Sequence, residues 1–179
     1  MSAEDNRTLR RPLFEEDVNM TAGDDRMVHP AGTNKTASLL GHQLTFGHRD
    51  PAGAYSLLDW VAPPTIPGPP LHLHRGTDEA FYILEGMFGF QAGEATIKGA
   101  VGVFVFIPRG IKHTFWNQGP LPDRMLCVVS PAGLEYYLEA LAEGLAIVGE
   151  APEAAMSLRK ALSEQYNVEV VGPPRQAMS

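Results

Sequence analysis

The sequence has little of what several classes of protein require. Cys127 is the only cysteine, so the chain can form no internal disulfide and no thiolate cluster, and any bound metal must take nitrogen and oxygen ligands. No apolar run approaches the roughly 20 residues that span a bilayer. The 14 lysines and arginines are outnumbered by 21 acidic residues, and the net charge of −7 argues against binding nucleic acid or acidic membranes. We therefore expect a small-molecule partner, with no nucleic acid and no membrane.

The N-terminal stretch also lacks a recognisable pattern. Its first residues, MSAEDNRTLRRPLFEEDVNM, are polar and acidic where a secretory signal would need a basic stretch followed by an apolar one. Together with the single cysteine, this predicts a cytoplasmic protein. Residues 1–37 show no sustained periodicity and are interpreted as an N-terminal arm, either loosely ordered or packed along a partner subunit. Its apolar residues favour packing, and an exchanged arm would give a homodimer.

Residues 38–130 are predicted to be rich in strands. Short apolar segments such as EAFYILEG, VFVFIP and RMLCVVS recur between glycines and prolines, a pattern typical of a β-sandwich or β-barrel. The bridge APPTIPGPP cannot lie in a central strand, because proline lacks the backbone N–H that a ladder needs. We interpret this bridge as the connection that leads to His72.

Residues 131–179 change from strand to helical periodicity. Apolar residues fall on one face of a first amphipathic helix, and a second helix begins at Pro152, a residue favoured at the first helical position. The expected apolar positions are Leu134, Tyr137, Leu138, Leu141, Leu145 and Val148 in the first helix, and Ala154, Leu158, Ala161, Leu162 and Tyr166 in the second. The prediction is a mainly β protein with an N-terminal arm and two C-terminal helices packing on the strands.

The stretch HLHRGTDEAFYILEG, residues 72–86, carries the main chemical signal. Alternate side chains of a strand share a face, so His72 and His74 would project to the same side, about 6.6 Å apart, and can reach one ion. Glu79 opens the next apolar segment and can return a carboxylate oxygen to the same point. A fourth ligand would come from a neighbouring strand, and His113 follows a proline–glycine turn that aims its strand back toward the others. The pattern predicts a metal site.

Other polar residues have simpler interpretations. His42 is expected to be a hydrogen-bonded structural histidine, and Asp78 and Arg109 are expected to face solvent. Asn117 is predicted to orient a loop through hydrogen bonds to the backbone. Cys127 is expected to be an inert buried residue.

The two stretches resemble the paired motifs of the cupin superfamily. The first motif, HxH followed by Glu and Gly, is matched by His72, His74, Glu79 and Gly86. The second motif, in the order Gly, Pro-x-Gly, His and Asn, is matched by Gly102, Pro108, Gly110, His113 and Asn117. One departure occurs: the first motif usually opens with a glycine where this chain has Ile66, and Gly68 stands two residues later.

The resemblance implies a small antiparallel jelly-roll barrel with a metal inside it. His72, His74, Glu79 and His113 would be the ligands of one divalent transition metal ion, and nitrogen and oxygen ligands suit Fe, Mn, Co, Ni, Cu or Zn alike. Three histidines and one carboxylate leave positions on the ion for water, substrate or dioxygen, which favours a catalytic site over a structural one.

The lining of the barrel then favours a class of substrate. If Glu79 faces inward, Phe81 and Ile83 share its face, and Phe115 shares the face of His113, so these three are expected to contact the substrate. The barrel segments near the ligands contain no cluster of Arg, Lys or Tyr that would clamp a dicarboxylate or a sugar phosphate. This favours an apolar or aromatic substrate.

The chain is most similar to single-barrel bacterial cupins described as quercetinase-like, which cleave the ring of flavonols with dioxygen. That resemblance implies a dioxygenase in which Glu79 is the catalytic residue, taking the proton of a substrate hydroxyl. Two alternatives stay open. The protein could be a non-oxidative metal-dependent cupin, such as a decarboxylase, isomerase or lyase, or a non-enzymatic small-molecule-binding cupin.

Overall fold

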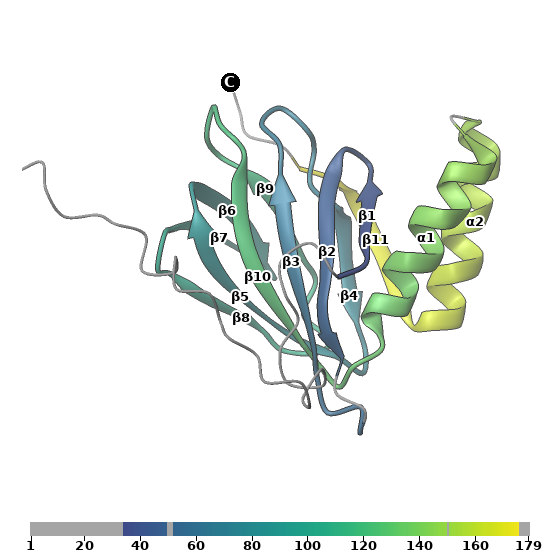
Figure 1. The fold of residues 1–179 in the computed structure, drawn as a ribbon, viewed down its shortest axis with the longest axis horizontal. Coiled ribbons are helices and arrows are strands. Elements are labelled where there is room, and N and C mark those ends of the chain that lie inside the picture. Colours follow the sequence, from purple (N-terminus) through teal and green to yellow (C-terminus); the bar gives the residue numbers. More distant parts are fainter. Residues whose placement is uncertain (1–33, 50–51, 150, 176–179) are drawn as a thin grey trace, which may run out of the picture.

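The chain folds into two antiparallel sheets that face each other (Figure 1). The structure is a computed structural model that describes residues 34–49, 52–149 and 151–175. Within them, the first sheet has the strand order β1-β2-β3-β10-β5-β8 and the second has the order β11-β4-β9-β6-β7. The strands of the first sheet are β1 (Thr36–Leu39), β2 (His42–Arg49), β3 (Ser56–Ala62), β5 (Asp78–Glu85), β8 (Phe104–Ile107) and β10 (Asp123–Ser130). Those of the second sheet are β4 (Pro70–His74), β6 (Met87–Ala92), β7 (Ala95–Ala100), β9 (His113–Asn117) and β11 (Val168–Pro174).

The core lies between the two sheets and follows from the strand period. In β3 (SLLDWVA) and in β10 (DRMLCVVS) every second residue is buried, so one face of each strand points inward. Both sheets contribute to a cluster of aromatic rings in which neighbouring centroids lie 5.5 to 6.2 Å apart, a spacing at which ring pairs attract one another. Its members are Phe81, Phe88, Phe90 and Phe115.

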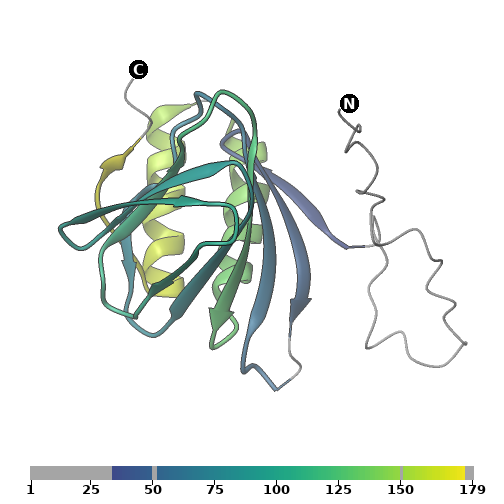
Figure 2. The ribbon, with the colours of Figure 1, turned by 90° about the vertical axis from the view of Figure 1, so that its left-hand side faces the viewer.

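Two helices pack against one side of the sheets. The helices α1 (Leu134–Val148) and α2 (Pro152–Tyr166) lie side by side, next to β1 and β11 (Figures 1 and 2). The helices approach each other closely at Gly144, where an added Cβ would lie 2.6 Å from a methyl carbon of Leu158. No helix in the described part of the chain is long and apolar enough to cross a membrane. The predicted mainly β fold with two C-terminal helices is confirmed.

Strand β11 was not predicted from the sequence. It pairs antiparallel with β4, placing Val168 opposite His74 and Val170 opposite His72. Its sequence, VEVVGPP, argues against a strand because glycine and proline weaken a ladder, but proline is tolerated at a sheet edge, and the pairing shifts register at Gly172. Residues 131–179 therefore supply a strand as well as helices.

The expected N-terminal arm, residues 1–37, falls largely outside the described residues, which begin at residue 34. Its last two residues, Thr36 and Ala37, belong to β1 instead. Strand β1 pairs with β2 in the register that places Leu39 opposite His42.

Candidate metal centre

Four side chains from three strands converge between the sheets. His72 and His74 come from β4, His113 comes from the adjacent β9, and Glu79 comes from β5 of the facing sheet. Their ligand atoms all lie within 4.8 Å of one another. His74, Glu79 and His113 are each no more than 5% exposed, and His72 is partly buried. The structure thus brings together all four residues that the sequence suggested as ligands.

Two of the imidazoles are oriented by the backbone. His72 Nδ1 lies 2.7 Å from the carbonyl oxygen of Pro70, and His113 Nδ1 lies 2.9 Å from that of Ile111. A carbonyl only accepts, so each Nδ1 carries the proton and donates it. In a neutral ring the Nε2 atom then carries a lone pair that can bind a cation, and His113 Nε2 would release the proton that it shares with Glu79 when it does so. Such contacts orient metal-binding histidines in proteins.

The third imidazole has an unused nitrogen. His74 Nε2 is buried and makes no hydrogen bond, although it lies 3.2 Å from Glu79 Oε2. The same carboxylate oxygen lies 2.6 Å from His113 Nε2. A buried polar atom without a partner is costly, and a cation between these atoms would satisfy it.

The electrostatics fit a neutral His72 and an ionised Glu79, whereas the hydrogen bond and charge of Glu79 raise the pKa of His113 despite its burial. Burial, and the neighbouring rings of His113 and His74, lower the pKa of His72 to about 3, so this ring is uncharged at neutral pH. Burial alone would raise the pKa of Glu79, but His74 and His113 hold it well below its usual value, so the carboxylate is ionised. These are the protonation states in which both residue types bind metals.

The donor set and its size fit one transition metal ion. Three imidazole nitrogens and one carboxylate oxygen suit Fe, Mn, Co, Ni, Cu or Zn. Bonds of about 2.1 Å place two ligands of one ion no more than about 4.2 Å apart, so the cluster needs to contract only slightly around a cation. The residues present therefore fit the metal that the motifs imply.

Glycines hold the ligand strands close together. An added Cβ on Gly68 would lie 1.6 Å from the carbonyl oxygen of Phe115, so only glycine allows the chain before β4 to approach β9 this closely. Gly86 and Gly110 have φ values of 76° and 81°, in the left-handed region that glycine adopts without strain. The motif usually has a glycine where this chain has Ile66. Here it is Gly68, two residues later, that allows the close approach to β9.

Arg109 is exposed to solvent, as the sequence suggested, but Asp78 is half-buried and the two residues form an ion pair. The carboxylate of Asp78 accepts hydrogen bonds from the backbone N–H of Arg109 at 2.7 Å and from its guanidinium at 2.6 and 3.1 Å. These bonds lower the pKa of Asp78 to about 2. The next residue, Gly110, donates its N–H to the carbonyl of His74 at 2.7 Å. The turn before His113 is thereby tied to the strands that carry His74 and Glu79.

The interpretations of Asn117 and His42 agree with the structure. The Nδ2 group of Asn117 donates to the carbonyls of Ala62 and Leu121, and its Oδ1 accepts the N–H of Gly119. His42 Nδ1 accepts a hydrogen bond from Trp60, and its Nε2 lies 2.9 Å from a backbone carbonyl. Both nitrogens of His42 are therefore used within the protein.

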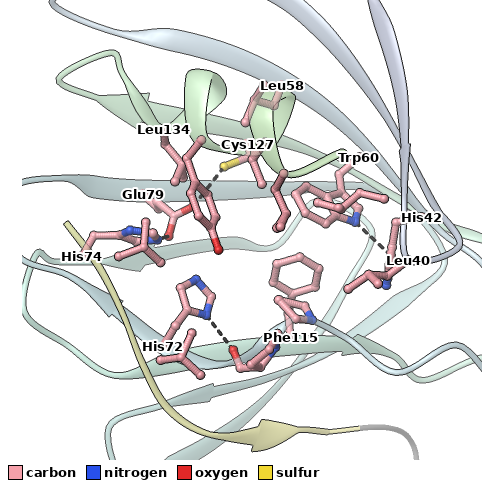
Figure 3. A pocket seen from close by; sticks show the side chains of 18 of the residues that line it. Leu40, His42, Leu58, Trp60, His72, His74, Glu79, Phe115, Cys127 and Leu134 are labelled. Carbon is pink, nitrogen blue, oxygen red and sulfur yellow. Dashed lines mark hydrogen bonds and ion pairs between the residues drawn. The ribbon is translucent and has the colours of Figure 1, made fainter. Parts of the chain in front are cut away.

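The cluster of His72, His74, Glu79 and His113 opens onto a cavity between the sheets and the helices. His72, His74 and Glu79 lie on one side of it, and Trp60 and Phe115 lie on the other (Figure 3). Of the three residues predicted to contact substrate, Phe81 and Phe115 line this cavity. Ile83 does not, and instead packs deeper, where its Cδ1 atom faces Gly99. The cavity is mostly apolar and narrow, with a volume of about 70 Å³.

The residues that close this cavity were not predicted from the sequence. Part of the wall comes from the C-terminal elements: Tyr137 and Leu138 on α1, Arg159 on α2, and Val168 and Val170 on β11. The apolar face of α1 was recognised, and it signalled burial against the strands. Nothing local marked Arg159 as different from other charged residues of an amphipathic helix.

Comparison with known proteins agrees with this geometry. A family model described as a cupin domain matches residues 60–129, which include all four residues of the cluster. Among solved structures, an RmlC-like cupin from Shewanella frigidimarina has a TM-score of 0.54 and 15% identity, covering 62% of this chain and 95% of its own. The chain contains a cupin domain, which spans residues 60–129. Its two facing sheets are those of the cupin jelly roll, as the motifs predicted.

Two other solved structures match about half of this chain. TT1209 from Thermus thermophilus is 26% identical, with a TM-score of 0.45, and covers 48% of this chain and 79% of its own. KdgF from Halomonas sp. is 16% identical, with a TM-score of 0.49, and covers 54% of this chain and 84% of its own. No curated protein matches the sequence.

Proposed function

We propose that this cupin is a metal-dependent dioxygenase that acts on an apolar or aromatic small molecule. The supporting observation is that the histidine–glutamate cluster opens onto a largely apolar cavity. His72, His74 and Glu79 all border the cavity, so a molecule inside it would lie against the cluster. A closed structural site would surround its ion with protein ligands, whereas a catalytic site keeps one side accessible.

The residues have distinct roles in this proposal. A bound redox-active metal would supply Lewis acidity and electron transfer to dioxygen. The three histidines serve as ligands only. Glu79 has a further role in this proposal: its Oε2 faces the histidines, while its Oε1 lies 3.7 Å from the thiol of Cys127. We propose that Oε1 takes the proton of a substrate hydroxyl as general base.

Cys127 would not compete for that proton. Burial raises the pKa of its thiol well above the usual value, and the charge of Glu79 adds to the effect. The thiol therefore stays protonated and cannot accept a proton from the substrate. Its role is that of an apolar neighbour of the base.

The cavity favours a substrate with an aromatic ring. Phe81, Phe115 and Trp60 offer ring faces and edges to a bound ring, and few polar atoms of the lining face the interior. A water-poor site also protects a reactive intermediate from hydrolysis. Ring cleavage of flavonols is the specific reaction that we propose to test first, with the hydroxyl-bearing ring enclosed. The narrow interior makes single-ring catechols the second substrate class.

The first experiment joins metal analysis to oxygen uptake. Protein purified without added metal or affinity-tag nickel would be analysed for its elements, and the same sample would be tested for oxygen consumption with flavonols and catechols. We expect about one redox-active ion per chain and substrate-dependent uptake. Bound metal without uptake across both classes would refute the dioxygenase, leaving a non-oxidative enzyme (a decarboxylase, isomerase or lyase) or a ligand-binding cupin.

The base role of Glu79 has a separate test. Glu79→Gln keeps the shape of the side chain but removes its capacity to accept a proton, so turnover should fall by about 100-fold or more. Glu85→Gln is the matched control, because Glu85 lies on the same strand but is exposed and away from the cavity. A Glu79→Gln protein that binds metal and keeps full turnover would exclude the base role.

A further inference from the structure

One guanidinium group lines the otherwise largely apolar cavity. Arg159 on α2 borders the cavity that contains the histidine–glutamate cluster. It also borders a second, outer groove formed by α2 and β11. It therefore stands at the boundary between the enclosed space and the exterior. A charged residue in this position meets any ligand that passes from the groove to the cluster.

Arg159 has no acidic partner among the residues that the structure describes. Its Nε atom is buried and makes no hydrogen bond, and no carboxylate of the described chain lies within 4.0 Å of its guanidinium. Glu169, which borders the same outer groove, is paired with Arg75. An arginine that only extends its charge to water keeps its nitrogens hydrated, and burial of Nε excludes that explanation for this atom.

Tyr137 lies close enough for the charge of Arg159 to affect its pKa. Burial raises the pKa of this phenol, and the Ser163 hydroxyl and the Arg159 guanidinium oppose the increase. Tyr137 and Arg159 both border the cavity, one from each helix. A phenolic hydroxyl beside a guanidinium offers two kinds of donor to one anionic group.

We propose that Arg159, assisted by Tyr137, forms a subsite for an anionic group, and that the natural ligand is an aromatic or apolar acid. The carboxylate of such a ligand would pair with Arg159 while its ring occupies the apolar cavity. The inference rests on the proposed function only for the reaction of the part of the ligand that lies next to the metal. The subsite itself depends on the position of Arg159 and on its lack of a partner.

Binding of matched acids and amides tests the subsite. Benzoate and cinnamate would be compared with benzamide and cinnamamide by isothermal titration calorimetry, using the full chain in metal-loaded and metal-stripped forms. A carboxylate can also bind a metal, so the stripped protein isolates the contribution of the chain. We expect each acid to bind at least about 10-fold more tightly than its amide in the stripped protein, because a charge-assisted hydrogen bond is made only by the acid.

Variants of α2 assign that preference to one residue. Arg159→Met keeps much of the apolar stem and should reduce the preference to near unity, whereas Arg159→Lys should retain part of it. Lys160→Met removes an adjacent positive charge that does not border the cavity and should leave the preference unchanged. Thermal melts of each variant would establish that it is folded. The proposal is overturned if acids and amides bind equally, if Arg159→Met keeps the preference, or if no acid binds at millimolar concentration.

The outcome separates this proposal from the proposed activity. Acid-selective binding that depends on Arg159, without oxygen uptake by metal-loaded protein, would retain the anion subsite and reject the dioxygenase. Oxygen uptake with neutral substrates, without any effect of Arg159→Met on binding, would retain the dioxygenase and reject the subsite.

Discussion

Gly68→Ala is predicted to disturb both the fold and the metal centre. The new Cβ would lie 1.6 Å from the carbonyl oxygen of Phe115, and real Cβ contacts essentially never fall below 3.0 Å. The clashing atom belongs to the backbone of β9, so no side-chain rotation relieves the contact. The chain before β4 and strand β9 must move apart, and β9 carries His113 only two residues from Phe115.

The size of the effect follows from the bond that this movement would break. The hydroxyl of Thr114 on β9 donates to the carbonyl of Pro69 at 2.6 Å across the gap that would open, whereas the N–H of Gly68 donates to the backbone carbonyl of Arg175, which is not on β9. A separation of more than about 1 Å takes the Thr114 bond beyond hydrogen-bond range, at about 1 kcal/mol, and the residual crowding adds about 1–3 kcal/mol. We expect a total loss of about 3 kcal/mol, or a melting temperature lower by about 6–12 °C.

The assay compares two alanine variants. Gly76 is the matched control because an added Cβ there meets no atom within 4 Å and its φ lies outside the left-handed region. Gly76→Ala should change stability by less than about 0.5 kcal/mol. Thermal melts would be combined with metal titration, in which Gly68→Ala should bind more weakly because His113 is displaced. A Gly68→Ala protein with unchanged melting temperature and metal affinity would refute the reasoning.

Three further predictions concern other parts of the protein. Asn117→Ala removes three hydrogen bonds to the backbone and should cost about 3 kcal/mol in urea denaturation, whereas a loss below about 1 kcal/mol would contradict the anchoring role. Removing bound metal with a chelator should lower the melting temperature, since free metal at 100 times Kd stabilises by about 2.7 kcal/mol; identical melts with and without chelator would argue against the site. The exposed Phe104 and Phe106 on the edge strand β8 support the proposed homodimer, with a second copy covering them. Light scattering should show a dimer that Phe104→Glu weakens, and a monomer at micromolar concentration for the unaltered chain would refute it.

The ligand cluster could be predicted because its determinants are local. Two histidines at alternate positions of one strand must share a face, and this requires only the strand period. The proline–glycine turn before His113 reverses the chain within a few residues, so its direction is also encoded nearby. The fold class followed from the same kind of signal, since the apolar period changes at Leu134 from strand to helix.

The position of Ile83 shows where the strand period ceases to be sufficient. Ile83 is buried on the same side of β5 as Glu79 and Phe81, as the alternation predicts. It lies four residues beyond Glu79, about 13 Å along the strand, and packs in the core instead of the cavity. Alternation specifies the face of a strand, but the extent of a cavity along that strand depends on what packs against it. In this protein the extent of the cavity along β5 is determined by elements that are distant in the sequence.

The C-terminal elements were the least predictable part of the site for the same reason. Strand β11 is held by pairing with β4, and glycine and proline in its sequence hid it from local analysis. The expectation of an uncharged cavity considered the barrel segments alone, while Arg159 comes from a helix that the fold brings to the cavity. Because β11 pairs with the strand that carries His72 and His74, this C-terminal region both encloses the ligand and supports the metal-binding residues. Deleting it would disturb binding and metal affinity together, so only a point change such as Arg159→Met can separate recognition of the ligand from construction of the metal centre.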